Sequence, residues 1–175
     1  TPMQMANLMC ILANKGYYYV PHLISGIGER KVVKPEYTKK NYVGIDQPYF
    51  ETVVNGMEKV VESGTAFWSR IPNIVMCGKT GTVENPHGKD HSVFVAFAPK
   101  DNPKIAIAVV VENAGFGASW AAPIASMMVE QYLTGKVSKP KYYQDRIMEA
   151  NLINPVEVKG KGKKSKGHKG HVEAD

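Results

Sequence analysis

The sequence predicts an α+β fold in which a three-stranded antiparallel sheet packs against helices. The first observation is three consecutive runs of strand composition joined by turn-rich connections, at residues 74–82, 92–98 and 104–112. Strands that follow one another through such turns form an antiparallel meander. The second observation is the helical spacing of apolar residues before and after these runs. The chain has 175 residues, 43% of them hydrophobic, which is enough for one domain with a core.

The first expected helix has a well-defined beginning. Thr1 is a suitable N-cap, Pro2 suits the first helical position, and Gln4 completes a capping box with the threonine. The body of the helix, residues 5–13, is apolar nearly all round, and Gly16 ends it. A helix of this kind is expected to be buried on most sides, unless the rest of the chain leaves part of it bare.

The remaining elements follow in order along the chain. Residues 17–20 and 31–33 are predicted to be short strands, interrupted by proline and glycine. A second helix is expected at 48–63, because apolar residues recur there at helical spacing: Phe50, Val53, Val54, Met57, Val60 and Val61. A third helix is expected at 119–133, after the last strand, with Gly135 behind its end.

Composition divides the chain into three parts. Residues 1–135 should form the folded part, 136–157 an extension, and 158–175 a Lys/Gly-rich tail. The tail has too little apolar surface to fold and is expected to be disordered. Of the net charge of +6, the last 30 residues contribute +3, from seven basic against four acidic side chains. Such a tail either solubilises the chain or touches polyanions.

The beginning of the chain and its cysteines bear on the compartment. The chain starts with threonine and contains no apolar run long enough to cross a bilayer. We therefore expect either a cytosolic protein or a piece of a longer one. Cys10 and Cys77 each lie in an apolar run and have no disulfide or metal-binding spacing, so they are predicted to be small buried hydrophobic residues.

The stretch with chemical meaning is Gly78-Lys79-Thr80-Gly81-Thr82, which follows the strand-like run 74–76. Successive side chains of a strand alternate between faces, so a site that uses both Lys79 and Thr80 must lie along the strand's edge. Gly81 leaves that edge open to another backbone. Lys79 offers a positive charge to a carboxylate. These features predict an edge that binds the end of a peptide as an added strand.

Two other interpretations of this stretch have to be weighed. A phosphate-binding loop would need a glycine where Asn73 stands and a helix after the motif, whereas residues 82–86 continue as an extended segment and then turn. The motif could also be no more than the polar end of a strand. Its neighbours in the sequence favour the functional interpretation.

Two further groups of polar residues are weaker candidates. His87, Asp90 and His91 could be drawn as metal ligands, but they lie on a Gly/Pro turn without an oriented scaffold, so we expect no metal and place them at the mouth of a cleft. Ser138 and Lys141 match the pattern S-x-x-K. A nucleophile and its base need adjacent turns of one helix, and Pro140 argues against a helix there.

Taken together, these residues resemble the C-terminal part of the transpeptidase domain of class B penicillin-binding proteins, particularly the penicillin-binding protein 2 branch. Lys-Thr-Gly is a signature of serine penicillin-binding proteins and β-lactamases. The resemblance covers about residues 1–135 and rests on several ordered motifs: 1–6, 13–16, 21–22, 56–57, 60–61, 64–66, 78–82, 88–91, 97–99, 111–113 and 122–124.

The resemblance implies a cofactor-free serine D,D-transpeptidase, anchored at the periplasmic face of the inner membrane, that cross-links peptidoglycan. Its expected partners are D-Ala-D-Ala stem peptides, β-lactams and the cell-elongation machinery. The implied substrate-binding residues are Lys79, Thr80, Gly81 and Thr82. Lys79 would orient the substrate carboxylate and the proton-shuttling hydroxyl, and Thr80 and Thr82 would bond that carboxylate. The backbone N–H of Thr82 would form half of the oxyanion hole, so Lys79 and Thr82 are the expected catalytic residues.

One departure from the family pattern limits this interpretation. The family also needs S-x-x-K and S-x-N, but S-x-N does not occur in the sequence and the one S-x-x-K is the match at Ser138. We therefore expect the nucleophile to lie upstream of Thr1 and this chain alone to be inactive. The edge of strand 104–112 should then be unpaired and could support a dimer.

Two other functions are open to test. The chain could be a non-enzymatic sensor or scaffold that kept the strand and lost the chemistry. It could also bind nucleic acid through its basic tail, but the folded part has no basic stripe. No nucleic-acid partner is therefore expected.

Overall fold

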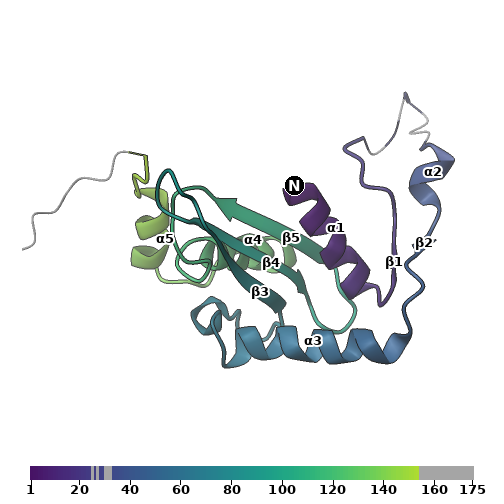
Figure 1. Ribbon diagram of the computed structural model, residues 1–175, viewed down its shortest axis with the longest axis horizontal. Helices are drawn as coiled ribbons and strands as arrows, with labels where there is room; N and C mark the ends of the chain where they lie inside the picture. The colour runs from purple at the N-terminus through teal and green to yellow at the C-terminus, as the bar shows by residue number, and fades with distance from the viewer. Residues whose placement is uncertain (25, 27, 30–32, 154–175) are drawn as a thin grey trace, which may run out of the picture.

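The computed structural model describes residues 1–24, 26, 28–29 and 33–153 of the 175-residue chain. Its centre is an antiparallel sheet of β3 (Cys77–Val83), β4 (His91–Ala98) and β5 (Ile105–Val111), in the order β3-β4-β5 (Figure 1). The predicted α+β fold and the three-stranded meander are confirmed. The proposed disorder of 158–175 lies outside the described residues.

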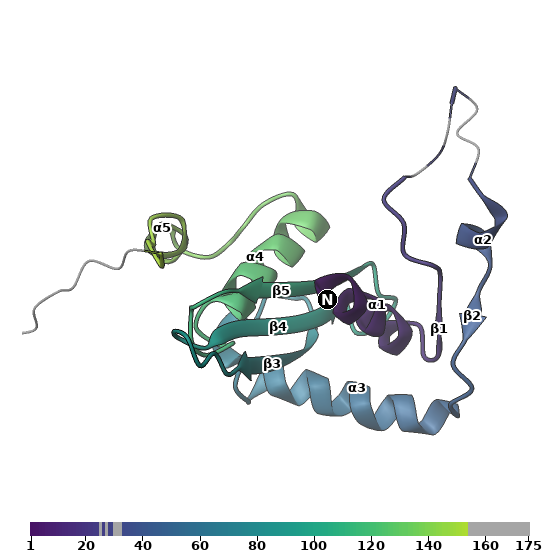
Figure 2. The ribbon, with the colours of Figure 1, turned by 45° about the horizontal axis from the view of Figure 1, so that its top comes forward.

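Helices cover both faces of the sheet. On one face, α4 (Ala121–Thr134) packs on β4 and β5. On the other, α1 (Pro2–Ala13) packs on β5 and β4, and α3 (Gln47–Glu62) packs on β3. Figure 2 shows α3 running along the β3 side of the sheet and α4 along the β5 side. The core therefore has two parts, one on each side of the sheet.

The beginning of α1 follows the predicted capping box. The Thr1 hydroxyl accepts a hydrogen bond from the Gln4 backbone N–H, and the Gln4 side chain bonds back to the N-terminal amine at 2.8 Å. Of the two expected outcomes for this helix, the structure shows the partly bare one, because Met9 is its buried residue while Leu8 is 50% exposed. Within the described residues, α1 contacts the sheet along one side and leaves the other in solvent.

The two later helices also match their predictions. Helix α3 is displaced by one residue from the expected 48–63, and α4 ends one residue beyond the expected 133. Gly135 caps α4 in the left-handed conformation, with φ 76°. The described residues include no helix long and apolar enough to cross a membrane.

Several short elements differ from the sequence-based expectations. The predicted strand 17–20 is reduced to β1 (Tyr17–Tyr18), which pairs with the unpredicted β2 (Asn41–Tyr42). Of the expected strand 31–33, Val33 is not in a strand and the rest lies outside the described residues. Three helical segments were not predicted: α2 (Pro35–Thr38), the 3-10 helix η1 (Phe67–Ser69) and α5 (Lys141–Met148).

One of the strand predictions needs correction and another is confirmed. Residues 74–76 precede β3 and do not belong to it, because Ile74 bridges Ile71 and the Val75 carbonyl accepts from the Lys100 backbone N–H at 2.7 Å. The third strand, β5, is covered on both faces as expected, by α1 on one and α4 on the other, with Ile107 its buried residue. As the last strand in the order, it has a sheet neighbour on one side.

The two cysteines have different environments. Cys77 is fully buried, and burial raises the pKa of its thiol to about 12, with a further contribution from the carboxylate of Glu58. Cys10 is half-buried, and burial raises its thiol pKa as well. The predicted burial is therefore confirmed for Cys77 and holds in part for Cys10.

This difference predicts selective alkylation. Iodoacetamide at pH 8 should leave Cys77 unmodified in the folded chain, since the thiolate is the reactive form and its fraction is very small at that pH. In denaturant both cysteines should react. Intact mass followed by peptide mapping distinguishes these outcomes, and rapid double modification of the folded chain would contradict the assigned burial of Cys77.

Candidate functional site

The Lys-Thr-Gly motif lies within β3, on the outer edge of the sheet. β3 pairs with β4 on one side, and no described residue forms a strand on its other side. Lys79 and Thr82 are exposed, while Thr80 and Gly81 are half-buried. The predicted open edge is therefore present among the described residues. The phosphate-loop interpretation is wrong, because the motif is inside a strand that continues to Val83.

The first glycine of the motif is required by the core. A Cβ atom at Gly78 would lie 2.4 Å from Cζ of Phe94, whose ring is completely buried. Phe94 is the cross-strand partner of Thr80, so its ring reaches diagonally across β3. The absence of a side chain at Gly78 thus lets β3 lie close to the core.

Gly81, the second glycine of the motif, is contacted by the loop that follows β5. A Cβ at Gly117 would lie 2.5 Å from the carbonyl oxygen of Gly81 and 2.3 Å from that of Val93. The loop 113–120, between β5 and α4, therefore touches the backbone of β3 and β4. The sequence suggested that Gly81 admits another backbone along the edge, and the structure shows in addition a backbone packed against its face.

Lys79 carries a positive charge that has no acidic partner within 4.0 Å among residues 1–24, 26, 28–29 and 33–153. Its Nζ donates a hydrogen bond to the Thr80 carbonyl at 2.7 Å. Among the described residues, the ion pairs within 4.0 Å involve other lysines, Lys15, Lys34 and Lys100. An ammonium has three donors, so Lys79 retains the capacity to bind an incoming carboxylate.

Thr80 is held from outside the strand by Thr65. Their hydroxyl oxygens lie 2.7 Å apart. Thr65 follows α3, and its loop is held by a 2.9 Å hydrogen bond from the Ala66 N–H to the Val60 carbonyl. The sequence motif 64–66 indicated a family resemblance but assigned no role to Thr65. No local pattern links two residues that are 15 positions apart.

The loop between β3 and β4 is bonded to the loop that follows β5. The Asn85 side chain donates to Asn113 Oδ1 at 2.7 Å, and the Asn113 N–H donates to His91 Nδ1 at 3.0 Å. The Asp90 backbone carbonyl accepts a hydrogen bond from the Gly115 N–H at 2.7 Å, and the Asp90 carboxylate accepts one from the Asn85 N–H. Asp90 and His91 thus have structural partners, and they hold the two loops together beyond the end of β3.

The S-x-x-K match does not form a catalytic pair. Ser138 lies in the connection after α4, whereas Lys141 is the first residue of α5. The two residues are not on adjacent turns of one helix. This agrees with the argument made from Pro140.

Comparison with known proteins identifies the family. The penicillin binding protein transpeptidase domain family matches residues 1–130. The peptidoglycan D,D-transpeptidase MrdA of Haemophilus influenzae is 32% identical over 170 residues, covering 85% of this chain and 26% of the relative. The enzyme of the same name from Acinetobacter baumannii is 34% identical over 158 residues, covering 80% of this chain and 23% of the relative. The chain thus spans about a quarter of the length of these curated relatives.

Solved structures agree with this result. Penicillin-binding protein 2 of Pseudomonas aeruginosa superimposes with a TM-score of 0.67 at 34% identity, covering 80% of this chain and 32% of that one. Penicillin-binding protein A of Mycobacterium tuberculosis, solved as a ceftriaxone acyl-enzyme complex, gives a TM-score of 0.65 at 27% identity, covering 77% and 32%. From the match of sequence and fold, the chain belongs to the penicillin-binding protein transpeptidase family.

Proposed function

We propose that the chain forms the Lys-Thr-Gly wall of a peptidoglycan D,D-transpeptidase that works through a serine acyl-enzyme. The observation that carries this proposal is the open edge of β3, where the Lys79 ammonium has no acidic partner among the described residues. A peptide that joins this edge gains main-chain hydrogen bonds, and its terminal carboxylate meets the ammonium.

Within this wall, each residue has a distinct proposed role. Lys79 orients the carboxylate of the substrate and holds the proton-shuttling hydroxyl. The hydroxyls of Thr80 and Thr82 donate hydrogen bonds to the same carboxylate, and Gly81 keeps the edge free of side chains. The backbone N–H of Thr82 supplies one of the two oxyanion donors. Loss of one such donor costs on the order of 3 kcal/mol of transition-state stabilisation.

The proposed reaction has two acyl transfers. A serine Oγ attacks the carbonyl between the two D-alanines, an ester bond forms, and the terminal D-alanine leaves with the transferred proton. An amine of a neighbouring strand then attacks the ester, forms the cross-link and releases the serine. A β-lactam enters the first step through its ring amide, which opens without producing a leaving molecule.

The nucleophile of this reaction is proposed to lie in residues outside the printed sequence. S-x-N is missing from the 175 residues, and Ser138 is not placed to attack with Lys141 as its base. The complete protein is proposed to act at the periplasmic face of the inner membrane with the cell-elongation machinery. The relatives named peptidoglycan D,D-transpeptidase support the proposed reaction, whereas the location and the elongation machinery are what the family resemblance implies.

A fluorescent penicillin tests the proposal. A longer form of the protein, extended on its N-terminal side, should become covalently labelled, and an excess of unlabelled ceftriaxone should prevent the labelling. The 175-residue chain should remain unlabelled on a denaturing gel. Stable labelling of the short chain would refute the missing nucleophile, and an unlabelled, folded longer form would favour a sensor or scaffold.

A further inference from the structure

Residues 136–148, here called the brace, follow α4 and pack back onto two loops. The first is the loop 63–76 between α3 and β3, and the second is the loop 113–120 between β5 and α4. The brace lies outside the part of the chain that the family matches, residues 1–130. It consists of an extended connection and the helix α5. In both overall views, α5 lies at the end of the sheet where the β3–β4 loop and the loop after β5 come together (Figures 1 and 2).

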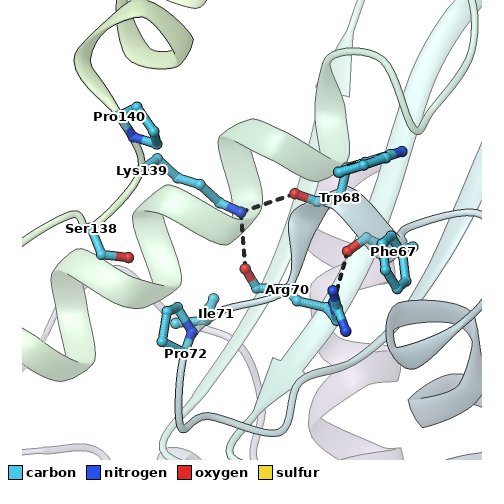
Figure 3. A pocket seen from close by; sticks show the side chains of 8 residues that line it. All are labelled: Phe67, Trp68, Arg70, Ile71, Pro72, Ser138, Lys139 and Pro140. Carbon is cyan, nitrogen blue, oxygen red and sulfur yellow. Dashed lines mark hydrogen bonds between the residues drawn. The ribbon is translucent and has the colours of Figure 1, made fainter.

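Lys139 connects the brace to the loop 63–76, which contains η1. Its Nζ donates to the carbonyl oxygens of Trp68 at 2.9 Å and Arg70 at 3.0 Å, at the end of η1 (Figure 3). These carbonyls are the unsatisfied acceptors of a helical turn, which favour a cation. The Lys139 backbone is held in turn, since its carbonyl accepts from the Gln144 side chain at 2.7 Å.

The loop that Lys139 holds is the loop that supports Thr80. η1 begins two residues after Thr65, whose hydroxyl contacts Thr80. Ser69 is buried next to α4, so this short segment has little freedom on its inner side. A bond at its outer side therefore limits the movement of the whole loop, including Thr65.

Arg146 connects α5 to the loop 113–120, between β5 and α4. Its guanidinium donates to the Ser119 carbonyl at 2.9 Å and lies 4.7 Å from the centre of the Trp120 ring. The same loop contains Gly117, which contacts the backbone of Gly81. Its path is further held by Ser92, whose hydroxyl donates to the Phe116 carbonyl at 2.9 Å.

We propose that the brace positions both walls of the Lys-Thr-Gly edge, with Lys139 acting through Thr65 on Thr80 and Arg146 acting through Gly117 on Gly81. Both are positioning residues that do not touch the ligand. The effect on ligand binding rests on the proposed function. The effect on the two loops does not.

Hydrogen exchange of the 175-residue chain tests the structural part. Lys139→Met should raise exchange in residues 64–70 about tenfold, and Arg146→Met should do so in 115–121, as expected for loss of one charge-assisted hydrogen bond. Lys139→Arg and Arg146→Lys should recover most of the protection because they retain the donor and the charge. Lys141→Met is the control, because Lys141 is an exposed cation of the brace on α5, the helix that also carries Arg146. Unchanged loops, or equal acceleration throughout the chain, would overturn the proposal.

Acylation of the longer form by a fluorescent penicillin tests the functional part. Lys139→Met should raise the dissociation constant of the pre-covalent complex about fivefold to tenfold, with a smaller change in the acylation rate constant, and Lys139→Arg should restore it. Loosened loops with an unchanged dissociation constant would refute the positioning role and leave the proposed function intact. If the wild-type longer form is not acylated at all, the proposed function fails, and the exchange experiment still decides whether the brace holds the loops.

Discussion

Replacement of Lys79 by methionine should lower the second-order rate constant for β-lactam acylation of the longer protein by at least about 30-fold. Methionine keeps most of the length of the side chain and removes the charge. The carboxylate of the ligand would then lie at the β3 edge without its cation, which typically costs about 2–5 kcal/mol when the site is closed to water. Lys79 is exposed and its Nζ bonds a backbone carbonyl of its own strand, so the fold should survive the change.

The matched control for this experiment is Lys59→Met. Lys59 is an exposed lysine on α3 with the same charge and a similar side-chain length. Its replacement should leave the acylation rate constant within about twofold, because Lys59 is not on the β3 edge and exposed charges are screened by salt. Time courses with a fluorescent penicillin give the rate constants for both variants. A Lys79→Met protein that reacts as fast as the Lys59→Met protein would exclude Lys79 from ligand binding.

Gly117→Ala should reduce the free energy of unfolding of the chain by about 2–3 kcal/mol. The new Cβ would lie 2.3 Å from the Val93 carbonyl oxygen and 2.5 Å from that of Gly81. Both atoms belong to the backbone of paired strands, so neither can turn away as a side chain could. The loop 113–120 would have to move off the sheet, and the contact with Gly81 would be lost.

A second glycine in the same chain provides a control with the opposite expected sign. Gly56 lies inside α3, and a Cβ there would meet no heavy atom within 4 Å. Gly56→Ala should raise the free energy of unfolding by about 0.5–1 kcal/mol, the gain typical of alanine over glycine within a helix. Urea denaturation of the three proteins measures both effects. Equal stabilities for Gly117→Ala and the wild type would show that the close approach of this loop is not maintained in solution.

Sequence patterns predicted those features whose physical cause is local. The Thr1 capping box was predictable because its donors and acceptors are three residues apart. The meander was predictable because short turns leave few ways to pair successive strands. The prediction failed for the run 74–76, whose apolar composition suits a strand, although here Met76 is buried and Ile74 packs against the core while Val75 is exposed.

Family resemblance supplied the roles assigned to the motif, and these roles remain predictions. Composition alone indicated a cationic strand next to two glycines. The different reasons for those glycines became clear only in the structure, since Gly78 is required by the Phe94 ring, whereas Gly81 lies under Gly117. Thr65 had no assigned role because its contact with Thr80 depends on where α3 ends relative to β3.

By itself, the sequence determined the α+β class, the ends of the main helices and the position of the Lys-Thr-Gly strand. These depend on capping, side-chain periodicity and turn residues, which act over a few positions along the chain. The tertiary structure alone decided that Thr65 supports Thr80 and that the loop 113–120 packs against Gly81. It also decided that Lys139 and Arg146 return from beyond α4 to hold the flanking loops. Such contacts join segments that are distant in sequence, so they exist only once the helices have packed against the sheet.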